Sequence, residues 1–193
     1  VSVSTSGGSL VLTGATIETT MVDLTGVTAI EINGGGGSDK VTINSSLAQN
    51  VTLNVGEVVL NAPITGAVAG TATNVTVNPG GSVQNGLDVA FVDATINLAG
   101  ATFSGNLVIS KSVNLVGDNA TTKLTASSGN VISLSGASFG GSNSVTISGI
   151  DFDGNAGAAA AGINVPATVS VGALSINNGD ISGFSLYGVS VFG

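Results

Sequence analysis

Two aspartates separated by one residue form the most promising chemical group in this sequence. Asp151 and Asp153 stand on either side of Phe152, and Asp180 follows one repeat further along. If this segment is a strand, both carboxylates lie on one face and Phe152 lies on the other. Paired carboxylates can hold a calcium ion or carry out glycoside hydrolysis. The simpler expectation, which we favour, is that Phe152 points into the core and both aspartates point to solvent.

A glycine-rich segment upstream offers a second candidate for calcium. Residues 34–42, GGGGSDKVT, match the calcium-binding nonapeptide G-G-x-G-x-D-x-U-x once. This match resembles the repeats of RTX proteins, in which aspartates and backbone carbonyls of stacked turns share each ion, and it would make Asp39 a ligand. No second copy follows, so a glycine-rich corner with a solvated Asp39 is the other interpretation. The candidate metal ligands are therefore Asp39, Asp151 and Asp153, for Ca²⁺, and no other cofactor is expected.

The residue types that are absent exclude several kinds of catalytic site. The chain has no His and no Cys, and its only basic residues are Lys40, Lys111 and Lys123. A Ser-His-Asp triad is therefore impossible, and so is a zinc site built on Cys and His. We assign neither Lys111 nor Lys123 the role of a base. The sequence predicts no catalytic residue and no enzymatic activity.

The charge balance excludes two classes of partner. Eleven carboxylates against three lysines give a net charge of −8. Binding to nucleic acid requires clustered Lys and Arg side chains that neutralise phosphates, and docking on anionic membranes has the same requirement. The longest apolar run is also too short to span a bilayer. We therefore expect neither nucleic-acid binding nor membrane insertion.

Short strands separated by Gly, Asn, Asp and Ser run through the whole chain. Several of them alternate strictly between apolar and polar residues, as in Val41–Ile43, Val51–Leu53 and Val145–Ile147. Aromatic residues make up only 4% of the chain, so Val, Ile, Leu and Ala must build the core. The expected strands are Ser9–Leu12, Thr28–Ile32, Lys40–Ile43, Asn50–Asn54, Val58–Leu60, Asn74–Val77, Ala94–Leu98, Asn106–Ile109, Ser112–Leu115, Lys123–Thr125, Val131–Leu134, Ser144–Ile147, Val169–Val171, Ala173–Ile176 and Tyr187–Val191.

The arrangement of these strands favours a solenoid over a sandwich or a barrel. Similar units recur, and asparagine, which suits repeated corners, follows many strands. Charged residues make up only 7% of the chain, as expected where most side chains face an interior or the next repeat. A sandwich would need more aromatic residues and clearer hairpin turns. The best hairpin-like dipeptide, Asn85-Gly86, stands almost alone. The sequence predicts an all-β fold, a right-handed parallel β-helix (β-solenoid) with little or no helix.

The last hundred residues resemble a known superfamily. The runs Leu107–Val113 (LVISKSV), Leu115–Asp118 (LVGD) and Ser144–Gly154 (SVTISGIDFDG) are similar to repeats of pectin-lyase-like right-handed β-helix proteins. The resemblance covers residues 93–193 and implies the fold more than any function. We expect three parts: β-rich or solenoid repeats over 1–78, an irregular connection over 79–92, and pectin-lyase-like repeats over 93–193.

These features predict a structural or adhesive role. We expect an extracellular or cell-surface β-solenoid module of a larger bacterial protein, such as a filament, a stalk or a surface-layer component. The alternative is a module that binds or degrades carbohydrate, with glycans as partners, although the chain has one Tyr and no Trp on which sugars could stack. An open solenoid end exposes unpaired backbone, so we expect a longer native chain or end-to-end self-association.

Overall fold

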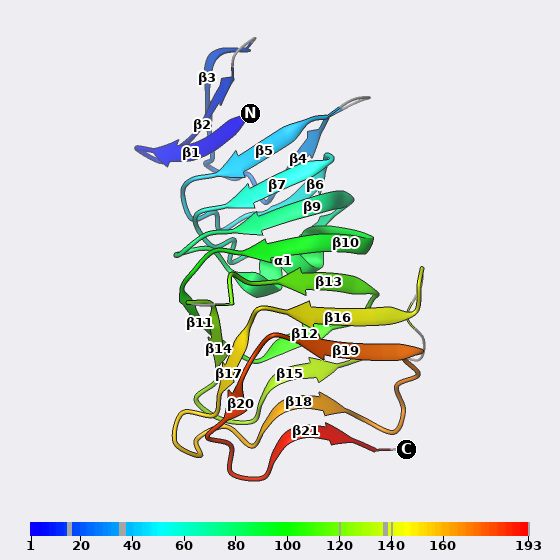
Figure 1. Cartoon of the computed structure of the whole chain (residues 1–193). Helices are drawn as coiled ribbons and strands as arrows, with labels where there is room; N and C mark the ends of the chain where they lie inside the picture. Colours follow the sequence, from blue (N-terminus) through cyan, green and yellow to red (C-terminus); the bar gives the residue numbers. More distant parts are fainter. Residues whose placement is uncertain (15–16, 35–37, 120, 137–138, 140, 193) are drawn as a thin grey trace. The chain divides into compact units, whose positions relative to one another are not determined.

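The protein is almost entirely built from strands. The computed structural model describes residues 1–14, 17–34, 38–119, 121–136, 139 and 141–192 (Figure 1). Strands account for 53% of the structure and helix for 4%, and most sheet pairings are parallel, which confirms the predicted all-β class. The chain divides into two compact units, residues 1–91 and 92–193.

The described residues of the first unit form nine strands and one helix. Their bounds are β1 Ser2–Ser6, β2 Ser9–Gly14, β3 Ile17–Asp23, β4 Ala29–Asn33, β5 Lys40–Ile43, β6 Asn50–Asn54, β7 Glu57–Leu60, β8 Val68–Gly70, β9 Ala72–Val77 and α1 Val83–Val89. One sheet has the order β9-β7-β5-β1-β2-β3, and the other has the order β4-β6-β8. Because β5, β7 and β9 alternate along the chain with β6 and β8, each repeat contributes one strand to each sheet.

From β5 to β9, equivalent residues of successive repeats lie 17 positions apart, and asparagines make the spacing visible. The Nδ2 atom of Asn61 donates to Oδ1 of Asn44 at 2.6 Å, and Nδ2 of Asn78 donates to Oδ1 of Asn61 at 2.7 Å, a separation of 17 residues each time. The Nδ2 atom of Asn44 in turn donates to Oγ of Ser2. Asparagines after strands were expected from the sequence, but the constant spacing that stacks them was missed.

Asn61 is the middle member of this asparagine ladder. Replacing it with alanine removes one donated and one accepted hydrogen bond, so we expect the free energy of unfolding to fall by about 1–2 kcal/mol. Asn61→Asp should cost at least as much, since a carboxylate would face Oδ1 of Asn44 instead of donating to it. Urea denaturation of both variants measures the effect. Two variants as stable as the wild type would show that the ladder contributes nothing.

The first three strands pair antiparallel, so of the two possibilities stated for residues 1–78, β-rich or solenoid repeats, this part of the chain is β-rich without parallel stacking. Strand β1 pairs antiparallel with β2, and β2 pairs antiparallel with β3, while the other edge of β1 pairs parallel with β5. Gly7 and Gly8 join β1 to β2 with φ angles of 56° and 84°. Two successive positive φ angles are typical of the tight turns whose twist suits a hairpin. The pair Gly7-Gly8 was therefore a hairpin signal that the sequence analysis did not use.

A short helix replaces the irregular connection expected over residues 79–92. Helix α1 begins after Ser82, whose Oγ accepts a hydrogen bond from the backbone N–H of Asn85. Val83 and Leu87 are buried, and the helix packs against β8, the last strand of the sheet β4-β6-β8. The dipeptide Asn85-Gly86, interpreted as hairpin-like, lies inside this helix because burial of its apolar face outweighs local turn preference. No helix among the described residues is long and apolar enough to cross a membrane.

The second unit repeats a set of three strands. Their bounds are β10 Ala90–Leu98, β11 Thr102–Ser104, β12 Leu107–Ile109, β13 Val113–Val116, β14 Lys123–Thr125, β15 Asn130–Leu134, β16 Ser144–Ser148, β17 Asp151–Asp153, β18 Ala161–Val165, β19 Ala173–Asn177, β20 Ile181–Ser182 and β21 Tyr187–Val191. Each strand pairs in parallel with the strand three places later, which gives the sheets β10-β13-β16-β19, β11-β14-β17-β20 and β12-β15-β18-β21 (Figure 1).

The connections between these strands differ in length. The sequence repeats of this unit are therefore unequal in length, although the strands still pair in register. The strand expected at Val169–Val171 is absent, because Pro166 opens a turn in which its carbonyl accepts from the N–H of Val169 at 3.0 Å. Conversely, β18 was missed because its first residue belongs to the alanine-rich run before it. That run, residues 156–161, forms turns and bends in the connection from β17 to β18, which spans residues 154–160, and ends on the first residue of β18.

Columns of aliphatic side chains fill the second unit. Ile96, Leu115 and Ile147 occupy the same register on β10, β13 and β16, and none of them is exposed to solvent. Leu124 and Phe152 stack in the same way on β14 and β17. Each such side chain contributes about 1.5–3 kcal/mol by leaving water, so the core stabilises the fold with few aromatic residues.

Candidate functional site

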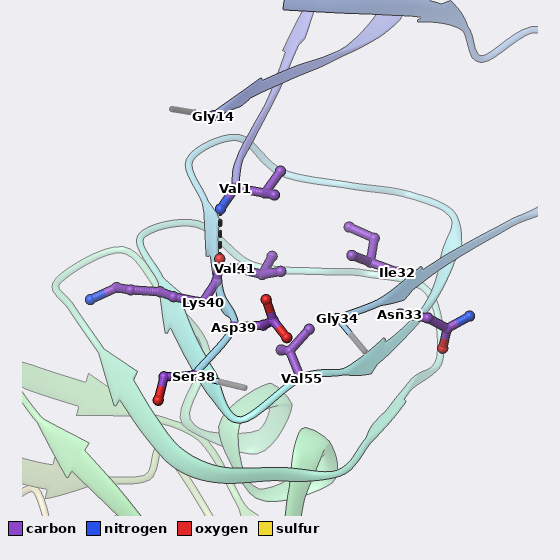
Figure 2. A pocket seen from close by; sticks show the side chains of 10 residues that line it. All are labelled: Val1, Gly14, Ile32, Asn33, Gly34, Ser38, Asp39, Lys40, Val41 and Val55. Carbon is purple, nitrogen blue, oxygen red and sulfur yellow. Dashed lines mark hydrogen bonds between the residues drawn. The ribbon is translucent and has the colours of Figure 1, made fainter. Parts of the chain in front are cut away.

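Asp39 lies in a pocket of about 420 Å³ in the first unit (Figure 2). Figure 2 shows its carboxylate among the aliphatic side chains of Ile32, Val41 and Val55, whereas the Lys40 side chain points away. The amino group of Val1 donates to the backbone carbonyl of Lys40 at 2.6 Å and closes one side. The lining residues are Val1, Gly14, Ile32, Asn33, Gly34, Ser38, Asp39, Lys40, Val41 and Val55.

This pocket supplies one carboxylate where calcium prefers six to eight oxygen ligands. Gly35, Gly36 and Gly37 of the nonapeptide match lie outside the described residues. Among the described residues, no three His, Cys, Asp or Glu side chains are grouped so that they could hold a metal ion. Calcium at Asp39 stays a prediction.

The calcium hypothesis has a direct thermal test. If Asp39 is a ligand, calcium chloride should raise the melting temperature of the wild-type chain, because a ligand that binds only the folded state stabilises it. Asp39→Asn should lose this response, while Asp93→Asn in the other unit, at a carboxylate that is not a candidate calcium ligand, should keep it. Differential scanning calorimetry with and without calcium measures the shift. An equal response in the wild type and in Asp39→Asn would rule out this site.

Asp151 and Asp153 lie on one face of β17 with Phe152 on the other, as the alternation predicted. Phe152 is 1% exposed, and both aspartates are partly exposed. Each carboxylate already accepts hydrogen bonds: Oδ1 of Asp151 accepts from the N–H of Asp180 at 2.8 Å, and Oδ1 of Asp153 accepts from the N–H of Asn155 at 2.8 Å. Asp180 therefore contacts Asp151 through its backbone N–H, as a hydrogen-bond donor. Calcium at Asp151 and Asp153 likewise stays a prediction.

The partner of Asp153 was not predicted from the sequence. Nζ of Lys123 lies 3.3 Å from Oδ2 of Asp153, because β14 and β17 are neighbours in the sheet. The N–H of Asn155, followed by Lys123, holds the pKa of Asp153 below its ordinary value. Both side chains are about 40% exposed, so solvent screens the pair and leaves it worth about 0–1 kcal/mol.

A shallow polar groove of about 340 Å³ runs past this ion pair. Hydroxyl groups, one amide, one ammonium and one carboxylate dominate its lining, and no aromatic side chain contributes to it. The lining residues are Thr102, Ser104, Lys123, Thr125, Ala126, Ser127, Asp153 and Asn155. Such a surface can exchange hydrogen bonds with a hydroxylated ligand. It offers no stacking platform for a sugar ring.

Asp118 is the most heavily hydrogen-bonded carboxylate among those described. It accepts from the N–H and hydroxyl groups of both Thr121 and Thr122. These bonds, led by the Thr121 hydroxyl, hold the pKa of Asp118 far below its ordinary value of 3.8. They tie the turn after β13 to the segment that enters β14, which is a structural role.

This depressed pKa predicts a dependence of stability on pH. Because the folded-state pKa lies below the unfolded one, the stabilisation by Asp118 is present above pH 3.8 and is lost as the pH falls below that value. In Asp118→Asn, stability should therefore depend less on pH below about 4 than in the wild type. Thermal melts between neutral and strongly acidic pH measure the two slopes. Asp23, Asp93 and Asp153, whose pKa values are also lowered, contribute to the remaining slope.

Comparison of the chain with protein-family models, with curated proteins and with solved structures found no match in any of the three.

Proposed function

We propose that this chain is a structural or adhesive module of an extracellular or cell-surface protein and that it catalyses no reaction. In this proposal the strand repeats wind into a right-handed parallel β-helix, the hand that nearly all parallel crossovers adopt. The observation that carries the proposal is the regular stacking of three parallel sheets over columns of buried aliphatic side chains. In such a design each repeat contacts its neighbours, so that an elongated body of constant cross-section can be built from short segments.

The chemistry of the candidate sites supports a role without catalysis. Asp151 and Asp153 accept backbone hydrogen bonds, and Asp153 also pairs with Lys123. The hydrogen bonds of Asp118 tie down a turn. These carboxylates therefore hold the backbone together, and the chain has no His, Cys or Arg to complete a reactive set.

Two measurements test this role. Antibodies raised against the chain should label intact source cells in immunogold electron microscopy without permeabilisation. Labelling only after permeabilisation would contradict the surface location. Incubation of the purified chain with a panel of polysaccharides should release no new reducing ends or unsaturated products. Cleavage of any polymer by this chain alone would contradict the absence of catalysis.

The polar groove beside Lys123 favours one second candidate, a glycan-binding module. Its hydroxyl, amide and charged groups suit a hydroxylated ligand in both donor and acceptor chemistry. If the groove is a site, a glycan array should give binding that Lys123→Ala in the groove abolishes and Lys40→Ala in the other unit preserves. An array without reproducible binding removes this candidate.

A further inference from the structure

The dipeptide Asn-Gly occurs three times in the chain, at residues 33–34, 85–86 and 178–179. Such a pair can modify itself, because glycine has no side chain to obstruct its nitrogen and the asparagine side chain is held within reach of it. The glycine nitrogen gives its proton to a base in the solvent and attacks Cγ of the asparagine. The Cγ–Nδ2 bond breaks, ammonia leaves and a cyclic imide remains, which water opens to aspartate or isoaspartate. The three pairs differ in the freedom of these reacting atoms.

The pair at residues 85–86 is held inside helix α1. Asn85 is 8% exposed, and its Oδ1 accepts from the N–H of Ile64 at 2.8 Å. The N–H of Gly86 donates to the carbonyl of Ser82 at 3.1 Å. Both the attacking nitrogen and the side chain that it would attack are therefore fixed, and the reaction would have to open the helix.

The pair at residues 33–34 is fixed by hydrogen bonds at the end of β4. Nδ2 of Asn33 donates to Oε1 of Glu31 at 3.0 Å, and Oδ1 of Asn33 accepts from Nδ2 of Asn54 at 2.8 Å. The N–H of Gly34 donates to the carbonyl of Asn54 at 3.0 Å. Attack by the Gly34 nitrogen would therefore break several bonds to the neighbouring strand.

The pair at residues 178–179 has neither restraint. It forms the corner between β19 and β20, where both residues are exposed. In the part of the chain that the structure describes, no hydrogen bond is formed by the Asn178 side chain or by the N–H of Gly179. The corner also explains both residue types, because asparagine tolerates the φ of 53° and a Cβ atom at Gly179 would overlap the carbonyl oxygen of Ile150. The fold thus requires this pair and leaves both reacting groups unbonded.

This freedom belongs to the corner itself, since the same features recur where a layer lies on either side. The registers of β16 with β19 and of β17 with β20 place Asn178 beside Gly149, whose φ is 65°, and Gly179 beside Ile150. The N–H of Ile150 also forms no hydrogen bond within the described residues, although strands pair with both edges of β16 and β17. Asn119 is exposed although its N–H donates to the carbonyl of Gly149. An asparagine at this corner is therefore open to solvent inside the stack as well.

We propose that Asn178 is a site of spontaneous deamidation in the folded protein, whereas Asn33 and Asn85 are protected. The reaction needs only water and a base from the solvent. It goes beyond the structural role proposed above and does not depend on that role. Its product carries one more negative charge, and the isoaspartate form routes the main chain through Cβ, which lengthens the corner by one atom.

The longer corner would disturb the strand that follows it. The corner is fixed on one side because the carbonyl of Asn177 accepts from the N–H of Gly149 at 3.0 Å. It is fixed on the other side by Asp180, whose N–H donates to Oδ1 of Asp151 and whose carbonyl accepts from the N–H of Phe152 at 2.7 Å. An extra main-chain atom cannot preserve both attachments, so β20 should separate from β17 and the second unit should lose stability.

Peptide mapping by mass spectrometry tests the site. After incubation of the wild-type chain in mildly alkaline buffer, the peptide with Asn178 should gain the mass difference between a hydroxyl and an amino group. The peptides with Asn33 and Asn85 should stay unchanged and serve as internal controls. In urea, where the protecting contacts are lost, all three should convert at similar rates. Equal conversion of the three in the folded chain, or an intact Asn178 while the urea sample converts, would overturn the proposal.

The variant Asn178→Gly tests the consequence for stability. Glycine adopts positive φ angles readily, as Gly149 does at the equivalent position, and it has no side chain to deamidate. Incubation should lower the melting temperature of the wild-type chain and leave that of Asn178→Gly unchanged. An equal loss in both proteins would show that the disturbance arises elsewhere and would overturn the effect assigned to this corner.

Discussion

Replacing Phe152 with alanine is expected to lower the free energy of unfolding of the second unit by about 3–5 kcal/mol. Phe152 is 1% exposed on β17 and stacks between Leu124 of β14 and Ile181 of β20. Truncation removes the apolar contacts and leaves a cavity that neighbouring strands, held by their backbone hydrogen bonds, cannot fill. Because domains are stable by only about 5–15 kcal/mol, this is a large fraction of the total.

Urea denaturation followed by circular dichroism measures this loss. Phe91→Ala is the matched control, because Phe91 is 52% exposed and its truncation should change stability by no more than about 0.5 kcal/mol. Similar losses in the two variants would contradict the placement of Phe152 in a packed column.

Gly117→Ala is expected to destabilise the second unit by about 1–3 kcal/mol. A Cβ atom at this position would lie 2.3 Å from the carbonyl oxygen of Gly149 and 2.7 Å from Cγ1 of Ile150. The backbone after β13 therefore runs against the backbone after β16 with no space for a methyl group. Relief requires the two layers to move apart, which strains the hydrogen bond from the N–H of Gly117 to the carbonyl of Ser148.

Thermal unfolding of Gly117→Ala, compared with Gly7→Asn, separates close packing from backbone conformation. A Cβ atom at Gly7 would meet no atom within 4 Å, and asparagine tolerates its positive φ of 56°. Gly7→Asn should therefore change the melting temperature far less than Gly117→Ala. The close approach of the two layers would be refuted if Gly117→Ala melted like the wild type.

Local alternation was enough to predict the strand-rich class and the orientation of β17. The pattern Asp151-Phe152-Asp153 has a period of two, and burial of Phe152 follows from that period alone. The same reasoning failed at Ser82–Val89, where an N-cap and a buried apolar face produce a helix in a segment rich in turn residues. The helix forms there because its apolar face is buried against the rest of the unit, and the turn preferences of single residues do not report such burial.

Sequence patterns could not predict which residues on different strands contact each other. Lys123 and Asp153 are 30 residues apart and meet only because β14 and β17 pair in register. The register in the second unit depends on connections of unequal length, so no fixed period reveals it. In the first unit, by contrast, the spacing of 17 between Asn44, Asn61 and Asn78 was present in the sequence and would have predicted their stacking.

The unequal connections of the second unit indicate where foreign sequence can be grafted. Between β17 and β18, Asn155 and Ala156 are both exposed and both have positive φ angles, so the chain turns outward there without entering a sheet. A peptide inserted between them would leave the strand register untouched, since chain ends that lie close together can be joined by a longer loop at small entropic cost. This turn is therefore a natural place to display an epitope on the side of the protein.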